Sequence, residues 1–285
     1  MTHTPAHFVD THQHLWVLSE RSYDWITPDF GILNQDYRPE DVVKDVAQAG
    51  VTATVLVQAA DTYDDTFYML SVERSVETVK AVVGWVPFDR PQEAREALDI
   101  LSNHSAIKGY RNLTHNYADP RWILQPSCGE TLTQIAKAGL GLDMVSVMSE
   151  HSRAIVELAD AHPDLKIVVD HMAKPDVSAK AWDEWAADMA ELATRPTVYV
   201  KHSGLNTASG QGWTSRDWQP YVDHCLEHFG SQRVMLGSDW PVSLLAGDYV
   251  GVWQAQLETI AQLSPSEQDD VCFKTAQRFY QLDLS

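Results

Sequence analysis

Eight short apolar runs, rich in β-branched residues, recur along this chain and dictate its architecture. They are Phe8–Thr11, Ala53–Gln58, Ala81–Val86, Ala106–Tyr110, Gly141–Val147, Lys166–Asp170, Thr197–Val200 and Arg233–Leu236. Several are apolar at consecutive positions, as in Val55-Leu56-Val57. Strands with this pattern are typical of a parallel sheet that is buried on both faces under helices.

Amphipathic helix patterns with recognisable starts lie between these runs. Pro39 and Pro91 each occupy the first turn of an expected helix. Ser127–Glu130 and Ser264–Glu267 have the spacing of a capping box, in which the two side chains each satisfy a backbone N–H at a helix start. The chain therefore alternates strands and helices throughout.

The spacing of the runs favours one closed barrel. Their starts lie about 25 to 45 residues apart, a suitable length for one strand, one helix and their loops. We predict an α/β fold, a (β/α)8 TIM barrel, in a single domain over residues 1–285. A doubly wound open sheet is the alternative. It normally has fewer strands and a phosphate-binding loop, and neither GxGxxG nor GxxxxGK[ST] occurs in the sequence.

Charge and cysteine usage exclude several classes of partner. With 21 Lys and Arg against 40 Asp and Glu, the net charge is −19, which repels nucleic acid and anionic lipid. The three cysteines, Cys128, Cys225 and Cys272, are far apart and are expected to be reduced thiols in the cytoplasm. We expect no signal peptide and no membrane span, and the oligomeric state stays open, a homo-oligomer included.

Polar side chains follow the expected strands, where barrel enzymes keep their chemistry. The candidates are His12, His14, Gln58, Arg111, His171, Lys201, Ser203 and Asp239. Side chains alternate faces along a strand, so His12 and His14 point the same way. Each residue alone could be structural. Together they form a set of cations, imidazoles and a carboxylate at one rim, which must pair with one another or serve a ligand.

This set indicates hydrolysis of an acyl carbonyl, which needs a polarised oxygen, an attacking water and a proton acceptor. Asp239 is the candidate base, while the three histidines, or a metal that they hold, could polarise the carbonyl. Arg111 and Lys201 could neutralise an oxyanion or bind a substrate carboxylate. Ser203 is the rival nucleophile, but it lacks a GxSxG elbow, and His202 should point to the opposite face.

The residues expected to bind the substrate are Trp16, Gln58, Tyr63, Ser203 and Trp240. The long segment 15–38 is rich in aromatic residues, and we expect it either to cover the site as a binding loop or to pack on the barrel rim.

Five motifs carry a family resemblance that spans essentially the whole chain. They are Asp10–His14, Lys108–Arg111, Asp170–Pro175, Val200–Leu205 and Gly237–Pro241. In this order they resemble the amidohydrolase superfamily and, within it, the lactonase branch often labelled amidohydrolase family 2. The resemblance implies a (β/α)8 barrel that hydrolyses a cyclic ester, typically a sugar-acid lactone such as an L-fucono-, L-rhamnono- or galactono-lactone. Relatives open the pyrone ring of a dicarboxylated intermediate.

The chain departs from the metal-dependent members of the superfamily at one strand. Those members usually carry a histidine at the end of strand 5, where this chain reads Met144–Met148 without one. A binuclear metal site is therefore not expected, and we favour an enzyme that requires no cofactor. One zinc bound by His12, His14, His171 and Asp239 is the alternative.

Two other functions stay open. A metal-dependent decarboxylase or amidase of the same superfamily would require a bound metal. A non-catalytic sugar-binding barrel would use the ten tryptophans for stacking. Otherwise the expected partner is a small-molecule lactone.

Overall fold

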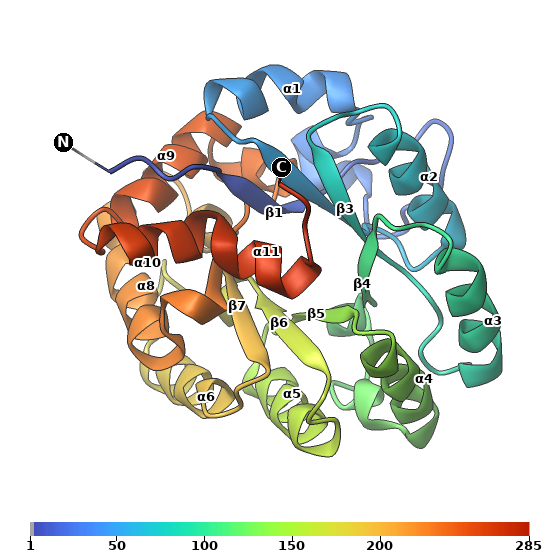
Figure 1. Cartoon of the computed structure of the whole chain (residues 1–285). Coiled ribbons are helices and arrows are strands. Elements are labelled where there is room, and N and C mark those ends of the chain that lie inside the picture. Colours follow the sequence, from blue (N-terminus) through green and yellow to red (C-terminus); the bar gives the residue numbers. More distant parts are fainter. Residues whose placement is uncertain (1–2, 285) are drawn as a thin grey trace.

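The computed structural model describes residues 3–284, which form one barrel of eight parallel strands surrounded by helices (Figure 1). The strands pair in sequence order. They are β1 (Val9–Gln13), β2 (Ala53–Val57), β3 (Val79–Gly84), β4 (Ile107–Arg111), β5 (Gly141–Val145), β6 (Lys166–Asp170), β7 (Val198–His202) and β8 (Val234–Leu236). Each predicted run overlaps one strand, and the predicted (β/α)8 barrel is confirmed.

The barrel closes where β1 meets the segment directly after β8. The backbone N–H of Asp239 donates to the carbonyl of His12 at 2.8 Å, and that of His14 donates to the carbonyl of Trp240 at 2.7 Å. Gln13 and Trp240 form a parallel bridge between the two segments. This closure places Asp239 next to the histidines of β1, although they are more than two hundred residues apart in sequence.

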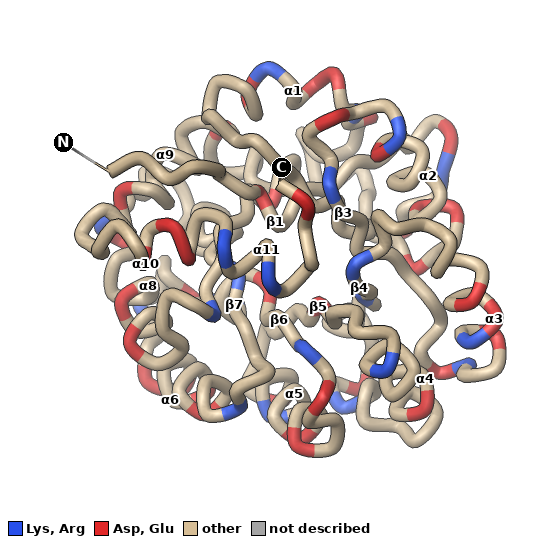
Figure 2. Tube along the Cα trace, viewed as in Figure 1, with Lys and Arg blue, Asp and Glu red and all other residues tan. Residues whose placement is uncertain are grey.

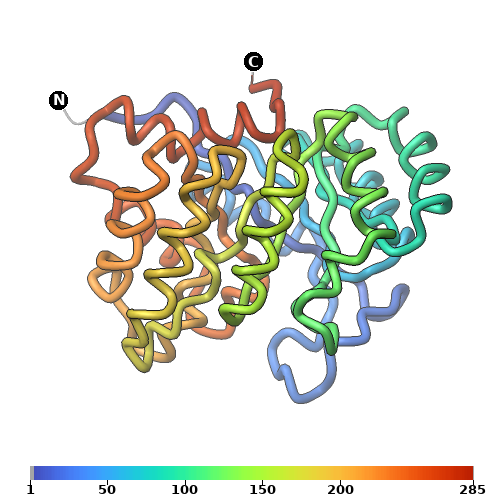
Figure 3. The backbone as a smooth tube through the Cα atoms, turned by 90° about the horizontal axis from the view of Figure 1, so that it is seen from below, coloured from blue at the N-terminus to red at the C-terminus, as the bar shows by residue number. Residues whose placement is uncertain are grey.

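The longer helices form the outer layer (Figure 1). They are α1 (Pro39–Gln48), α2 (Tyr63–Glu73), α3 (Pro91–Leu101), α4 (Pro126–Lys137), α5 (Ser149–Ala161), α6 (Asp183–Ala193), α8 (Ser215–Phe229) and α9 (Tyr249–Thr259). The short helix α7 (Leu205–Ser209) follows β7. Helices α10 (Pro265–Asp269) and α11 (Thr275–Tyr280) lie at the amino-terminal end of the barrel, beside both chain termini. Figure 3 shows the termini at one end and the loop after β1 at the other.

Most of the expected helix starts are confirmed. Pro39 and Pro91 occupy the first turns of α1 and α3, and Ser264 forms a capping box with Glu267. The capping box predicted at Ser127 is wrong. Helix α4 begins at Pro126, two residues before the start that a cap at Ser127 requires, because proline has the helical φ already fixed and does not need the N–H that the first turn leaves unpaired.

Acidic residues recur on the outer helices among fewer basic ones (Figure 2), as the net charge of −19 requires. Within residues 3–284, no helix combines the length and the apolar character needed to cross a membrane.

The segment 15–38 serves both purposes that the sequence left open. Trp16, Tyr23 and Tyr37 are buried, and the ring of Trp16 packs edge-on against Tyr37 and at a tilt against Tyr23. Trp25 and Phe30, farther along, line a cavity at the carboxyl end of the strands. One part of the loop therefore anchors it to the barrel rim, and the other part forms a wall of the cavity.

His202 on β7 points away from the barrel interior, as the alternation along the strand predicts. It is fully buried, and its Nε2 lies 3.0 Å from the hydroxyl of Thr259 on α9. Burial lowers the pKa of His202 to about 3. The unfolded chain therefore binds a proton below pH 6.5 that the folded chain does not, and the free energy of unfolding must fall as the pH drops from 6.5 towards 3.

We expect the wild-type protein to lose about 2 kcal/mol of stability through this residue between pH 6.5 and pH 5. Urea unfolding at both pH values, on wild type and His202→Gln, measures the effect. The variant should lose less stability over that interval, and an equal loss in both proteins would contradict the assignment to His202.

Candidate active site

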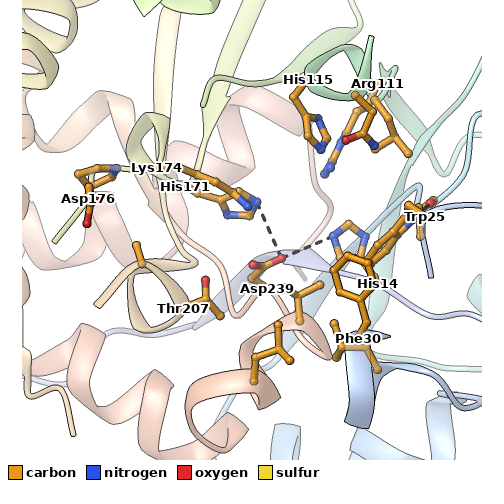
Figure 4. A pocket seen from close by; sticks show the side chains of 18 residues that line it. His14, Trp25, Phe30, Arg111, His115, His171, Lys174, Asp176, Thr207 and Asp239 are labelled. Atoms are coloured by element: carbon orange, nitrogen blue, oxygen red, sulfur yellow. Dashed lines mark hydrogen bonds and ion pairs between the residues drawn. The ribbon is translucent and has the colours of Figure 1, made fainter. Parts of the chain in front are cut away.

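A cavity of about 550 Å³ opens at the carboxyl ends of the strands (Figure 4). Its polar wall includes His14, Arg111, His115, His171, Lys174 and Asp239. Its apolar wall includes Trp25, Phe30, Leu33, Leu113, Val242 and Leu245. The cavity is therefore large enough for a small molecule and presents both hydrogen-bonding and hydrophobic surface to it.

Three imidazoles surround the carboxylate of Asp239. Its Oδ1 lies 3.6 Å from Nε2 of His14 and 3.8 Å from Nε2 of both His12 and His171. The Nε2 atoms of His12 and His14 are 3.0 Å apart. Figure 4 shows Asp239 between His14 and His171. The structure thus brings together four side chains from β1 and from the segments after β6 and β8, as their positions after the strands led us to expect.

Hydrogen bonds on the far side of the rings orient two of these imidazoles. Nδ1 of His14 lies 2.7 Å from the carbonyl of Val57, which can only accept, so this nitrogen carries the proton. Nδ1 of His171 lies 2.8 Å from the hydroxyl of Ser203. The hydrogen bond to Val57 leaves Nε2 of His14 directed towards Asp239. Ser203 is buried, and its hydroxyl orients the imidazole of His171.

A left-handed turn carries His171 into the cavity. Four consecutive residues, His171 to Lys174, have positive φ angles of 56°, 50°, 56° and 47°. Each such residue costs roughly 1–2 kcal/mol, so the surrounding structure must hold the turn in place. Trp185 does so by donating its indole N–H to the carbonyl of Met172 at 2.7 Å. The turn directs the side chains of both His171 and Lys174 at the cavity (Figure 4).

Gly204 gives this turn its space. Its φ is +65°, and a Cβ there would lie 2.9 Å from Nδ1 of His171 and 3.2 Å from Oδ2 of Asp239.

Gly204→Ala should therefore displace the imidazole and lower kcat by about tenfold or more. Gly210 is the matched control, because its φ is +75° and nothing lies within 4 Å of a Cβ. Both variants should lose stability, but Gly210→Ala should keep its turnover. Equal kcat values for the two would contradict the crowding argument.

Lys201 lies behind His12 and does not line the cavity. It is fully buried, and its Nζ contacts Asp143 at 2.5 Å, Asp170 at 3.2 Å and Nδ1 of His12 at 3.1 Å. Arg111 reaches the same network from the cavity side, 3.3 Å from Asp170 and 3.0 Å from Nε2 of His12. Two cations and two carboxylates thus balance one another around one imidazole. Of the two predicted cations, only Arg111 faces the cavity.

Electrostatics leave an ionised carboxylate beside the neutral imidazoles of His12 and His171. Burial, reinforced by Lys201, holds the pKa of His12 well below its usual range, and burial does the same to the pKa of His171. Burial acts to raise the pKa of Asp239, but His171 and His14 offset it, so that this pKa falls below its usual value. Asp239 is therefore ionised at neutral pH and can accept a proton.

The donor atoms around Asp239 fit a metal ion. Imidazole nitrogens and a carboxylate oxygen are ligands that zinc prefers, and Oδ2 of Asp239 is buried with no hydrogen-bond partner among the described residues. Nε2 of His171 and Oδ2 of Asp239 make no hydrogen bond to the described residues, whereas Nε2 of His14 lies 3.0 Å from Nε2 of His12. His12 would first have to release the hydrogen bond of Arg111. A second ion on Asp170 is disfavoured, because Lys201 and Arg111 already engage that carboxylate.

All five of the expected substrate-binding residues lie outside the cavity wall formed by the described residues. Ser203 contacts Nδ1 of His171 instead. Trp16 and Trp240 are buried, and Tyr37 packs edge-on against both rings. Gln58 donates to Asp61 and to the carbonyl of Arg111. Tyr63 donates to Glu93. Trp16, Gln58 and Trp240 therefore contact neighbouring segments of the rim, and Tyr63 on α2 reaches helix α3.

Sequence reasoning missed several polar residues of the cavity wall, among them His115 and Lys174. Burial and the nearby Arg111 lower the pKa of His115 to about 3, so its imidazole is neutral and can hydrogen-bond a ligand. Lys174 belongs to the Asp170–Pro175 motif. That motif was a usable signal, but only the left-handed turn reveals where the side chain points.

Comparison with known proteins assigns this arrangement to a family. A model described as amidohydrolase matches residues 9–282. The chain belongs to this family. The amidohydrolase is 34% identical over 279 residues to an L-fucono-1,5-lactonase of Burkholderia ambifaria, with 96% of each chain covered. It is 30% identical to an L-fucono-1,5-lactonase of Burkholderia multivorans, again with 96% of each chain covered. Its place in the lactonase branch of amidohydrolase family 2 is thereby confirmed.

A solved structure bears on the metal. An amidohydrolase from Burkholderia multivorans with bound zinc superposes with a TM-score of 0.91 at 28% identity, covering 98% of this chain and 100% of that one. Together with the donor atoms around Asp239, this relative removes the support for our expectation that no cofactor is required. The sequence alone could not decide whether a metal is bound, because Arg111 could supply positive charge at the same place as a zinc ion.

Proposed function

We propose that this amidohydrolase hydrolyses sugar-acid lactones, such as L-fucono-, L-rhamnono- or galactono-lactone. One observation carries the proposal: the buried carboxylate of Asp239 lies among three imidazoles in a cavity of about 550 Å³. The two L-fucono-1,5-lactonases that match the whole barrel supply the substrate class.

In the proposed reaction, Asp239 takes a proton from a water molecule while the water oxygen bonds to the lactone carbonyl carbon. The carbonyl oxygen becomes an oxyanion, which the guanidinium of Arg111 stabilises from the cavity wall. The intermediate then collapses, the bond from the carbonyl carbon to the ring oxygen breaks, and protonated Asp239 returns its proton to that oxygen. The product is an open-chain hydroxy acid, which releases one proton to solvent.

A zinc ion held by His14, His171 and Asp239, and by His12 once Arg111 moves, would activate water and polarise the carbonyl. The same residues would hold the imidazoles in place with or without a zinc ion. Ser203 and Val57 fix the imidazoles, and the Lys201 network holds His12.

The substrate contacts that we propose are His115 and Lys174 for the hydroxyl groups of the sugar acid, and Trp25 and Phe30 for its apolar face. All four line the cavity. We also propose that the enzyme acts in the cytoplasm as a single domain. Its three cysteines are free and buried, as expected of reduced thiols.

A panel of aldonolactones tests the function, with a pH indicator reporting the released proton, with and without a chelator. Elemental analysis of the same protein measures bound zinc. We expect lactone hydrolysis. Turnover of an amide or an aromatic carboxylate, with none of any lactone, would replace the proposal by a metal-dependent amidase or decarboxylase. Binding of lactones without turnover would favour a sugar-binding barrel.

A further inference from the structure

The C-terminal helix α11 lies across the amino-terminal end of the barrel (Figure 1). Tyr280, in its last turn, is fully buried. Its hydroxyl lies 3.0 Å from Oδ1 and 2.9 Å from Oδ2 of Asp143 on β5. Burial and Asp143 raise the pKa of Tyr280 well above its usual value, so the hydroxyl keeps its proton and donates.

Asp143 links this hydroxyl to the reactive centre. Its Oδ2 holds the ammonium of Lys201 at 2.5 Å, and Lys201 in turn lies 3.1 Å from Nδ1 of His12. All four residues are at most 2% exposed. A continuous set of contacts therefore runs through the barrel, from its amino-terminal end to an imidazole beside Asp239.

We propose that Tyr280 is a positioning residue of the active site, which orients Asp143 and thereby fixes Lys201 against His12. The inference rests on the proposed hydrolysis, because His12 lies beside Asp239, the proposed base. Oδ1 of Asp143 has no other hydrogen-bond partner among the described residues, so without the tyrosine hydroxyl the carboxylate can rotate. Lys201 would follow that rotation because Asp143 is its nearest partner.

The helix itself has other attachments. Phe279 packs against Gly141, where an added Cβ would lie 2.5 Å from its ring, and Lys166 donates to the carbonyl of Phe279 at 2.7 Å. The ring of Tyr280 also lies 5.6 Å from the ammonium of Lys201, a contact that phenylalanine preserves. Removing only the hydroxyl should therefore leave α11 docked.

The test compares Tyr280→Phe with Tyr199→Phe. Tyr199 contacts Phe279 of the same helix, with ring centroids 5.0 Å apart, and its hydroxyl makes no hydrogen bond to any described residue. We expect Tyr280→Phe to lower kcat by about 10–100-fold with little change in KM, because Tyr280 does not line the cavity. Tyr199→Phe should keep the wild-type kcat. An unchanged kcat in Tyr280→Phe, with wild type active and Asp239→Asn inactive, overturns the inference and leaves the proposed function standing.

Two further measurements keep the inference testable in every case. The ring 15N resonances of His12, assigned by their loss in His12→Gln, should shift in Tyr280→Phe but not in Tyr199→Phe. This readout needs no substrate, so an unchanged spectrum overturns the inference even if no lactone is hydrolysed. If Tyr280→Phe does not fold, Asp143→Asn takes its place. An unchanged kcat and an unchanged His12 spectrum in that variant would overturn the inference in the same way.

Discussion

Asp239→Asn should lower kcat for lactone hydrolysis by about 10²–10⁴-fold while the protein stays folded. The amide has the shape of the carboxylate, but it cannot accept the proton of the attacking water. The carboxylate is buried and its pKa lies below the usual value, so in wild type it is ready to act as a base at neutral pH. Steady-state kinetics on the best lactone, together with a melting curve, measure the two quantities.

Asp176→Asn is the matched control for this variant. Asp176 also lines the cavity, but its Oδ1 accepts from Ser178 and from the N–H of Ala179 within its own loop. It should therefore keep most of its activity. Near-wild-type turnover by Asp239→Asn would remove the proposed base, and an equal loss in both variants would point to the charge of the cavity instead.

Lys201→Met should destabilise the protein by about 3–5 kcal/mol, because it leaves two buried carboxylates with one cation fewer. Asp143 and Asp170 are both fully buried, and Lys201 contacts each of them. For a domain of this size the melting temperature should fall by roughly 10 °C. Thermal unfolding followed by circular dichroism measures the change.

Lys166→Met serves as the comparison, since it removes the same charge from a half-buried lysine that donates to a carbonyl of α11. Loss of one such hydrogen bond costs about 1 kcal/mol. If the two variants had the same melting temperature, the contacts of Lys201 would contribute no more to stability than the single hydrogen bond of a half-buried lysine.

The barrel could be predicted from sequence because its strands are buried on both faces. Such strands are apolar at consecutive positions, and proline and capping residues mark the helices between them. The residues at or just after the carboxyl ends of the strands, such as His12, Arg111 and Asp239, were also predictable as neighbours. Parallel strands end at one rim, so these side chains meet without any knowledge of the loops.

What sequence could not give is the direction of a side chain that leaves the regular strand. Lys174 reaches the cavity through a left-handed turn that no propensity of its residues predicts. Trp16 and Trp240 follow strands but pack under neighbouring loops. Lys201 stands on a strand, yet it points to carboxylates inside the barrel, because charge balance there outweighs contact with a ligand.

The seam of the barrel divides the reactive centre between the two ends of the chain. His12 and His14 lie at the end of the first strand and Asp239 just after the last, and the hydrogen bonds across this seam join Asp239 to His12 and Trp240 to His14. An N-terminal half of the chain therefore carries His12 and His14 without Asp239, and a C-terminal half carries Asp239 without these two histidines. Recovered lactone turnover on mixing two such halves would report their reassembly into one ring.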